Sequence, residues 1–253
     1  MIGREALGLR MESWLAGAVD RQAPLVFRDL RKGAQALSAR YVEKRGATGA
    51  LEKALDSPAR RGAFATYYAG LHLIQSYLCA ERQLGWESVR RIVDLGAGTG
   101  AAGFGTSLAL AAAPPVEAID RSGWALAEAR AAGRDLGVRV RTRRQDLGRG
   151  LPRFASEDGI VAGWFLNELP ERARAEAVER LAHAAEGGSR LLIIEPLAGA
   201  AAPWWSDVAT RLGVPSIEVR ERFALPGWIR DMDKAAGLDH GELRVRAMGH
   251  LQG

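Results

Sequence analysis

The periodicity of hydrophobic residues along the chain changes near Gly85. Before it, residues 30–45 and 60–84 carry apolar side chains at spacings of three and four, a pattern that predicts amphipathic helices. Turn signals fill the stretch between them, and Ser57-Pro58 predicts a break just before the second helix. We therefore expect residues 1–85 to form a helical N-terminal domain without strands.

After Trp86, short apolar runs alternate with amphipathic segments. Strands are predicted over 90–96, 114–120, 138–146, 158–167 and 189–196, and helices over 103–113, 122–137 and 172–186. Past Pro196 the pattern is weaker and predicts helices over 203–212 and 226–237 and a last strand over 242–249. Strands that alternate with helices pair in parallel through right-handed crossovers. Residues 86–253 are thus expected to form an α/β domain with a doubly wound, mostly parallel sheet.

The composition fits a globular chain. At 253 residues and 47% hydrophobic it can bury a full core. No run of about 18 apolar residues occurs, and charges at Arg4, Glu5, Arg10 and Glu12 make the N-terminus a poor signal peptide. We expect a cytoplasmic location and no membrane partner. The single cysteine, Cys79, excludes an internal disulfide and a multi-cysteine metal site, four scattered histidines add no ligand spacing, and no metal is expected.

Positive charge is concentrated at the front of the chain. The net charge is +5, and residues 1–61 hold twelve Lys and Arg against seven Asp and Glu, so this segment carries the whole excess. A basic segment suits an acidic partner such as RNA, or it forms a solvated helical surface. A second cluster, RVRTRRQ at 139–145, predicts a solvent-facing strand edge, where charge discourages aggregation.

The segment RIVDLGAGTG (91–100) carries the first chemical signal. Gly96, Gly98 and Gly100 allow a tight turn from strand to helix and let a ligand approach the backbone. Residues 98–103 also match the G-x-G-x-x-G pattern of dinucleotide sites. Asp94, however, offers a negative charge that repels a diphosphate and attracts a cation. An acid at the strand end followed by G-x-G-x-G therefore favours S-adenosylmethionine, which has an ammonium, a sulfonium and no phosphate.

Two further acids follow the next strands. Asp120 closes the second strand about 20 residues past the glycines, where it can accept hydrogen bonds from ribose hydroxyls of either cofactor. Asp146 follows the third strand and can bind the adenine amine, with Leu147 bordering the ring. The alternatives are a helix cap at Asp120 and a turn residue at Asp146.

With these motifs, residues 90–196 resemble a class I S-adenosylmethionine-dependent methyltransferase, and VDLGAGTG matches the first motif of that superfamily. The resemblance implies a Rossmann-like methyltransferase sheet, S-adenosyl-L-methionine as cofactor and methyl transfer as the reaction. It also implies the cofactor-binding residues: Asp94, Leu95, Gly96, Ala97, Gly98 and Gly100 at the methionine end, Asp120 and Arg121 at the ribose, Asp146 and Leu147 at the adenine, and Phe165.

The segment WFLNELP (164–170) follows the fourth strand, where the transferable methyl is expected. Asn167 and Glu168 are the catalytic candidates, because they can position an amine or hydroxyl and Glu168 can accept a proton. The same residues also suit an ordinary entry to the next helix. No N-P-P-aromatic sequence, typical of adenine and amide N-methylating enzymes, is present here. Cys79 is expected to be a buried helix residue. The four histidines are expected to be surface or capping residues.

The front of the chain carries a second resemblance. The segments ALSARYVEKRG (36–46) and AFATYYAGLHLI (63–74) resemble the methyltransferase-like family associated with the small ribosomal subunit of bacteria and mitochondria. Phe64 replaces that family's proline, Arg61 falls one place early, and its cysteine cluster is missing, so an iron–sulfur centre is not carried over. The resemblance implies ribosomal RNA or the small subunit as partner.

Several functions therefore remain open. The chain is expected to be a methyltransferase that transfers a methyl group to a nucleophilic N, O or C atom of an RNA or ribosomal substrate. The alternatives are a methyltransferase acting on a small molecule, with the helical region as a lid, and a ribosome assembly factor that binds the cofactor without turnover. A NAD-dependent oxidoreductase is the remote alternative, through the glycine spacing of residues 98–103.

Overall fold

The computed structural model describes residues 2–43, 55–197 and 202–251, with the side chains of 40–43 left out. Within these ranges seven strands form one sheet in the order β3-β2-β1-β4-β5-β7-β6. The strands are β1 (Arg91–Leu95), β2 (Val116–Asp120), β3 (Val140–Arg144), β4 (Asp158–Gly163), β5 (Arg190–Pro196), β6 (Ser216–Glu221) and β7 (Leu243–Gly249).

Strands β1 to β5 pair in parallel, whereas β7 runs antiparallel to both β5 and β6. This confirms the predicted mostly parallel α/β sheet, and β3 lies at its edge as the basic cluster predicted. Two expectations were wrong. The sequence analysis missed β6, and it extended the fourth strand to Asn167, whereas β4 ends at Gly163. Because β1 lies between β2 and β4, the chain order reverses there, and the carboxyl ends of β1 and β4 flank the expected ligand crevice.

The described part of the N-terminal region is helical, as predicted. It contains α1 (Arg4–Asp20), α2 (Phe27–Glu43), α4 (Pro58–Ala63), the π-helical turn η1 (Phe64–Tyr68) and α5 (Ala69–Ala80). The predicted break is confirmed, since the Ser57 side chain caps α4 by accepting a hydrogen bond from the Arg60 amide at 3.4 Å. The later helices are α6 (Ala101–Ala109), α7 (Gly123–Leu136), α8 (Glu171–Glu186), α9 (Trp205–Leu212) and α10 (Gly227–Ala236).

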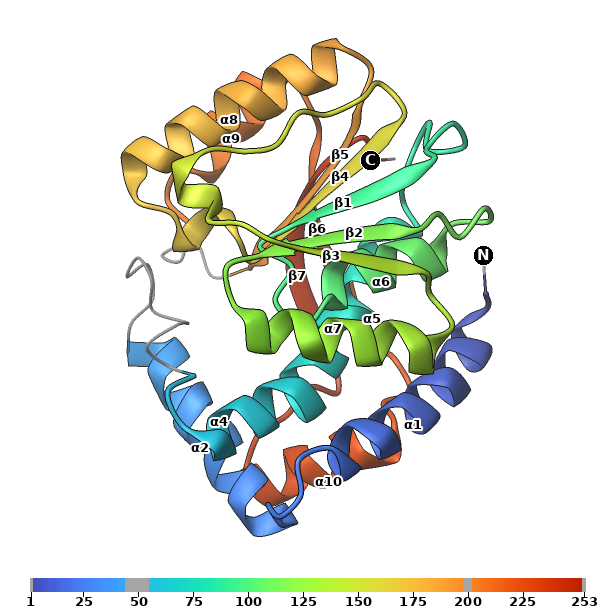
Figure 1. Ribbon diagram of the computed structural model, residues 1–253, viewed down its shortest axis with the longest axis vertical. Coiled ribbons are helices and arrows are strands. Elements are labelled where there is room, and N and C mark those ends of the chain that lie inside the picture. Colours follow the sequence, from blue (N-terminus) through green and yellow to red (C-terminus); the bar gives the residue numbers. More distant parts are fainter. Residues whose placement is uncertain (1, 44–54, 198–201, 252–253) are drawn as a thin grey trace.

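These helices form layers on both faces of the sheet (Figure 1). Helices α8 and α9 cover one face, and α5, α6 and α7 cover the other, with α1, α2, α4 and α10 outside them. One continuous hydrophobic cluster joins Leu7 of α1 and Leu73 of α5 to Ile92 and Val161 of the sheet. The N-terminal helices therefore share their core with the α/β region. The domain boundary near Gly85 stays a prediction.

The contact between α5 and α6 joins the two regions most closely. A Cβ atom added at Gly105 of α6 would lie 2.3 Å from the carbonyl oxygen of Leu73 and 2.9 Å from the amide nitrogen of Tyr77, both in α5. Only a glycine lets the two helix backbones approach this closely. The crossing fixes where the residues of α5 lie relative to the loop that precedes α6.

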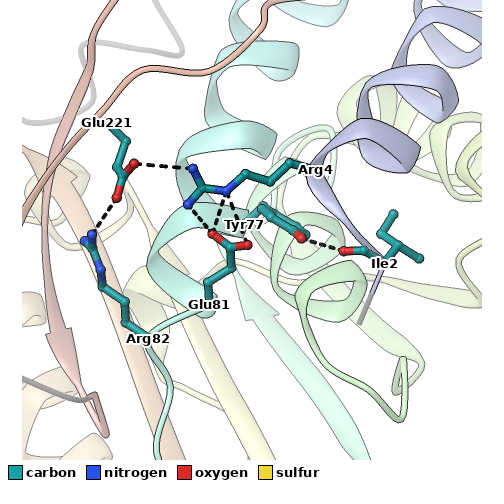
Figure 2. A network of polar contacts seen from close by, with 6 residues as sticks. All are labelled: Ile2, Arg4, Tyr77, Glu81, Arg82 and Glu221. Atoms are coloured by element: carbon teal, nitrogen blue, oxygen red, sulfur yellow. Dashed lines mark hydrogen bonds and ion pairs between the residues drawn. The ribbon is translucent and has the colours of Figure 1, made fainter.

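A polar network ties the first turn of α1 to the end of α5 and to β6 (Figure 2). The Arg4 guanidinium pairs with Glu81 at 2.7 Å and with Glu221 at 3.3 Å, and Arg82 pairs with Glu221 at 2.7 Å. The Tyr77 hydroxyl donates to the carbonyl oxygen of Ile2 at 2.5 Å. Partly exposed ion pairs contribute little singly. Here several share partners, and together they fix the end of the chain on the fold.

We expect Gly105→Ala to lower the free energy of unfolding by about 1–3 kcal/mol, because the new methyl group forces α5 away from α6. Urea denaturation followed by circular dichroism measures the change. Gly123→Ala is the matched control: no atom lies within 4 Å of its added Cβ, so this variant should be neutral or slightly more stable. Equal stabilities for the two variants would contradict the close crossing.

Candidate functional site

The loop after β1 provides the backbone geometry of the site. Gly96, Gly98 and Gly100 have φ angles of +64°, +52° and +85°, in the left-handed region that disfavours other residues. A Cβ added at Gly96 would lie 2.3 Å from the Phe165 ring, so this glycine is also required by packing. At Gly98 the nearest atom to an added Cβ is Cε1 of Phe64, at 3.9 Å. Gly98 is thus the least crowded of the three glycines, with only the Phe64 ring in van der Waals contact.

Asp94 lies beneath this loop rather than exposed in the crevice. Its side chain is fully buried, Oδ2 accepts a hydrogen bond from the Gly103 amide at 2.9 Å, and Oδ1 has no hydrogen-bond partner. Burial raises the pKa of Asp94 to about 7; the Gly103 amide opposes this shift, and the charge of Asp120 adds to it. An unpaired buried carboxylate oxygen beside a second acid creates a local need for positive charge.

Asp120 joins the end of β2 to the same loop. Its Oδ2 accepts a hydrogen bond from the Gly98 amide at 2.9 Å, and its Oδ1 accepts one from the Ser122 amide at 2.7 Å. The next residue, Arg121, is exposed. Each carboxylate oxygen can accept a second hydrogen bond, so the arrangement is compatible with the ribose role predicted for Asp120. That role stays a prediction.

Asp146 and Leu147 occupy the turn after β3. Asp146 begins the short 3-10 turn η2 (Leu147–Arg149), where its Oδ1 accepts from the Gly148 amide at 3.1 Å and its Oδ2 pairs with Arg149 at 3.2 Å. The Leu147 side chain is buried in the hydrophobic cluster beneath α8. Asp146 thus acts as a turn residue, one of the two expected roles, and its contact with adenine stays a prediction.

The segment after β4 departs from the predicted strand at Trp164. This residue has φ +55°, although its amide still donates to the carbonyl oxygen of Ile194 at 2.8 Å. The short turn η3 (Leu166–Glu168) follows, so Asn167 and Glu168 lie on a turn rather than on a strand. The Oδ1 atom of Asn167 is buried without a hydrogen-bond partner. Buried polar atoms are normally hydrogen-bonded, so this oxygen lacks a partner that a ligand could supply.

Sequence reasoning missed Glu195, which holds this turn in place. Glu195 is fully buried at the end of β5, and its Oε1 accepts from the Asn167 amide at 3.2 Å. Burial raises its pKa to about 8, the Asn167 amide and the Arg246 charge oppose that shift, and Glu168 adds to it. The signal that identifies such a residue is an acid closing an otherwise apolar parallel strand, the same signal that drew attention to Asp94.

The histidines were also predicted incompletely. His183 is exposed, and His250 accepts a hydrogen bond from the Leu191 amide at 3.0 Å, as expected of surface and capping residues. His72 and His240 are not of this kind. The His72 ring stacks on the Trp164 ring with centroids 3.8 Å apart and planes 15° apart, and His240 Nδ1 lies 2.8 Å from Asp233 Oδ1. The expectation that these two are surface or capping residues was wrong.

Other chemical expectations concern metals, thiols and membranes. Among the described residues, no group of three or more His, Cys, Asp or Glu side chains is placed to hold a metal ion. Cys79 is buried in α5, as predicted, and burial raises the pKa of its thiol to about 12. The helices in the described ranges include none with the length and apolar character needed to span a bilayer.

Two surface cavities lie away from the glycine loop. They measure about 260 and 290 Å³ and share Arg91, Glu117 and Arg141, with further arginines at 139, 143 and 153 in one or the other. Arg91 and Glu117 lie in the first two residues of β1 and β2, whereas the glycine loop follows the last residue of β1. These cavities are therefore separate from the candidate site.

Comparison with known proteins supports the fold. No family model matches the sequence, and no curated protein matches it. Among solved structures, mitomycin 7-O-methyltransferase MmcR is 15% identical to this chain, with a TM-score of 0.51. The match covers 98% of this chain and 76% of the MmcR chain. The O-methyltransferase NcsB1 from neocarzinostatin biosynthesis is 19% identical to this chain, with a TM-score of 0.54, and its structure is in complex with S-adenosylmethionine and 2-hydroxy-5-methyl naphthoic acid. The match covers 93% of this chain and 70% of the NcsB1 chain.

A putative RNA methyltransferase from Pyrococcus horikoshii is 13% identical to this chain, with a TM-score of 0.42. The match covers 78% of this chain and 85% of that protein. None of these comparisons tests the resemblance to the small-ribosomal-subunit family, which stays a prediction.

We expect Asp94→Asn to stabilise the protein at pH 8 relative to the wild type, and much less at pH 5. The raised pKa means that the folded state favours protonated Asp94, so the wild type loses stability as pH rises from about 4 through 7. Asparagine keeps the acceptor for the Gly103 amide and removes the charge. Urea denaturation measures the free energy of unfolding of both proteins at both pH values. The advantage of Asp94→Asn over the wild type should grow by roughly 2 kcal/mol from pH 5 to pH 8. An advantage that is independent of pH would contradict the raised pKa.

The comparisons establish the fold of the chain. Despite identities below 20%, the chain shares the α/β fold of the O-methyltransferases MmcR and NcsB1 along nearly its whole length.

Proposed function

We propose that the chain is a methyltransferase that uses S-adenosyl-L-methionine. The observation that carries this proposal is the glycine loop held between Asp94 and Asp120. Three left-handed glycines allow a ligand to lie against the backbone, and the two carboxylates favour a ligand with positive charge over a diphosphate. The buried and unpaired Oδ1 of Asp94 adds negative charge beneath the loop, which favours the ammonium or sulfonium of this cofactor.

The expected cofactor residues lie on four consecutive strand ends. Asp94 lies in β1, the glycines follow it, Asp120 and Arg121 follow β2, Asp146 and Leu147 follow β3, and Phe165 packs on the loop from the end of β4. In our proposal the β1 residues hold the methionine end, Asp120 the ribose and Asp146 the adenine. NcsB1, with the same fold, is in complex with S-adenosylmethionine.

When bound, the cofactor supplies a methyl group on a good leaving group. The protein then has to align the acceptor and exclude water, which contributes several kcal/mol without a dedicated base. Asn167 is suited to alignment because its Oδ1 is buried and unpaired. Glu168 follows on the same turn and is the candidate for accepting a proton.

Calorimetry with S-adenosylmethionine and NAD tests the cofactor. We expect the wild type to bind the first and not the second. Asp94→Asn should weaken S-adenosylmethionine binding about tenfold at pH 8, the loss of roughly one charge-assisted interaction. Exposed Asp231 provides the control, and Asp231→Asn should bind like the wild type. Tight NAD binding, or an unchanged affinity for S-adenosylmethionine in Asp94→Asn, would remove the proposal.

For the acceptor, we favour a small molecule. The helical N-terminal region packs over the sheet through the α5–α6 crossing and brings Phe64 beside the glycine loop. A helical wall beside the loop favours a compact acceptor over a large one. MmcR and NcsB1 share this fold over 98% and 93% of the chain, and their names associate them with mitomycin and a naphthoic acid.

RNA is the second candidate, and the basic N-terminal residues favour it. On α2, Arg28 and Lys32 are exposed, whereas Arg31 is half-buried with an unpaired Nε. The side chain of Arg40, together with Lys44 and Arg45, lies outside the described residues. Ribosomal RNA or the small subunit would then be the partner, either as a substrate or for an assembly factor that binds the cofactor without turnover.

Filter binding to ribosomal RNA distinguishes the two acceptors. If RNA is the substrate, the affinity should fall steeply between 50 and 200 mM salt, and Arg28→Ala combined with Lys32→Ala should weaken binding and reduce the salt slope by about 2. If the acceptor is small, as we favour, we expect weak binding that both substitutions leave unchanged. Steep salt dependence together with methylated RNA would overturn the small-molecule proposal.

A further inference from the structure

His72 has an unusual environment for a histidine. It is half-buried in α5, and its ring nitrogens, which are not fully buried, make no hydrogen bond to another described residue. A ring nitrogen that is not fully buried is available to a ligand or to water. Burial, with a smaller effect of the His240 charge, lowers the pKa of His72 to about 3, so the ring is neutral near pH 7 and keeps one nitrogen as an acceptor.

The partner of His72 is held in a strained conformation. Trp164 has φ +55°, which is rare for a bulky residue and costs on the order of 1–3 kcal/mol. Strain of this kind persists where the surrounding structure requires it, and it is concentrated at functional sites. Here it places the indole flat against His72 at the carboxyl end of β4, where a ligand of an open α/β sheet binds.

Two more rings from the N-terminal helices complete the arrangement. The Phe64 ring meets His72 edge-on at 6.1 Å, and the Tyr68 ring lies 6.4 Å from it. Both come from the π-helical turn η1, and such turns are frequent at functional sites. Phe64 also borders Gly98. We call Phe64, Tyr68, His72 and Trp164 the aromatic cluster.

A buried polar network anchors the turn that carries this cluster. The Tyr67 hydroxyl donates to Asp233 and lies 3.1 Å from His240 Nδ1, and the His240 amide donates to Asp233 Oδ2 at 3.0 Å. Tyr67 precedes Tyr68 in η1, while Asp233 lies in α10. The network fixes η1 against α10 and thereby positions Phe64 and Tyr68. It does not include His72, whose ring nitrogens stay unpaired.

We propose that the aromatic cluster is the acceptor site, that it binds a planar aromatic molecule carrying a hydroxyl group, and that a ring nitrogen of His72 accepts the hydrogen bond of that hydroxyl. This inference rests on the proposed methyltransferase function and specifies its substrate class. Flat rings bind against aromatic side chains by stacking. A neutral imidazole selects a hydroxyl donor over an ether of the same shape.

Calorimetry with two matched probes tests the hydrogen bond, using the full chain. 2-Naphthol carries the hydroxyl, and 2-methoxynaphthalene has the same rings without a donor. We expect the wild type to bind 2-naphthol about fivefold more tightly, the effect of one neutral hydrogen bond. His72→Phe keeps a ring on Trp164 and removes the nitrogens, so it should bind both probes equally. His183→Phe, at an exposed histidine of α8, should keep the preference.

A second variant tests stacking independently of His72. Trp164→Leu should weaken both probes several-fold, because it removes the stacking surface. Circular dichroism establishes that each variant is folded. Wild-type protein that binds neither probe, or that binds both equally, would overturn the inference, as would a naphthol preference that survives in His72→Phe.

Cofactor binding is measured on the same variants to separate the two proposals. S-adenosylmethionine affinity should be unchanged in His72→Phe, since His72 is not part of the glycine loop. If the wild type binds the cofactor but shows no naphthol preference, only the acceptor inference fails. If it shows the preference but does not bind the cofactor, the proposed function fails and the aromatic site stands.

Discussion

The close crossing of α5 and α6 at Gly105 is the constraint on which the rest of the site depends. With 2.3 Å between the Leu73 carbonyl oxygen and the position of an added Cβ, no side chain fits at Gly105 and the two helix backbones pack directly against each other. Helix α6 begins directly after the glycine loop, and His72 precedes Leu73 in α5. One contact therefore sets the position of an N-terminal helix relative to the strand ends of the α/β region. The polar network around Arg4 acts in the same direction at the far end of α5 (Figure 2).

Buried acids give this region its chemical character. Asp94 and Glu195 close β1 and β5, are fully buried, and have pKa values raised to about 7 and 8. Burying a carboxylate without a full set of partners costs stability, and each of these two has one oxygen without a hydrogen bond. A protein that carries such groups gains from a ligand that returns positive charge or hydrogen-bond donors to them. Stability and ligand preference are thus linked at the same atoms.

The sequence predicted well what depends on local pattern. Hydrophobic periodicity located β1 to β5 and β7, and the glycines of the β1 loop predicted the left-handed turn that the structure contains. The β6 segment, SIEVRE, pairs only with β7, and its short alternation of polar and apolar residues is a strand signal that the prediction overlooked. The prediction failed where tertiary contacts decide. The strand predicted through Asn167 ends at Gly163 because Trp164 adopts a positive φ, which no propensity favours. The environment of His72 could not be predicted from local sequence, because Trp164 and His240 lie about 90 and 170 residues away along the chain.

The same contacts bear on whether the N-terminal helices form a separate lid. A lid that opens by rigid motion needs an interface that separates at low cost. Here Leu7 and Leu73 share a core with Ile92 and Val161, and the α5–α6 contact is made by backbone atoms. Opening along this interface would expose the main hydrophobic core, at a cost comparable with unfolding. The N-terminal helices are therefore better described as a fixed wall of the site.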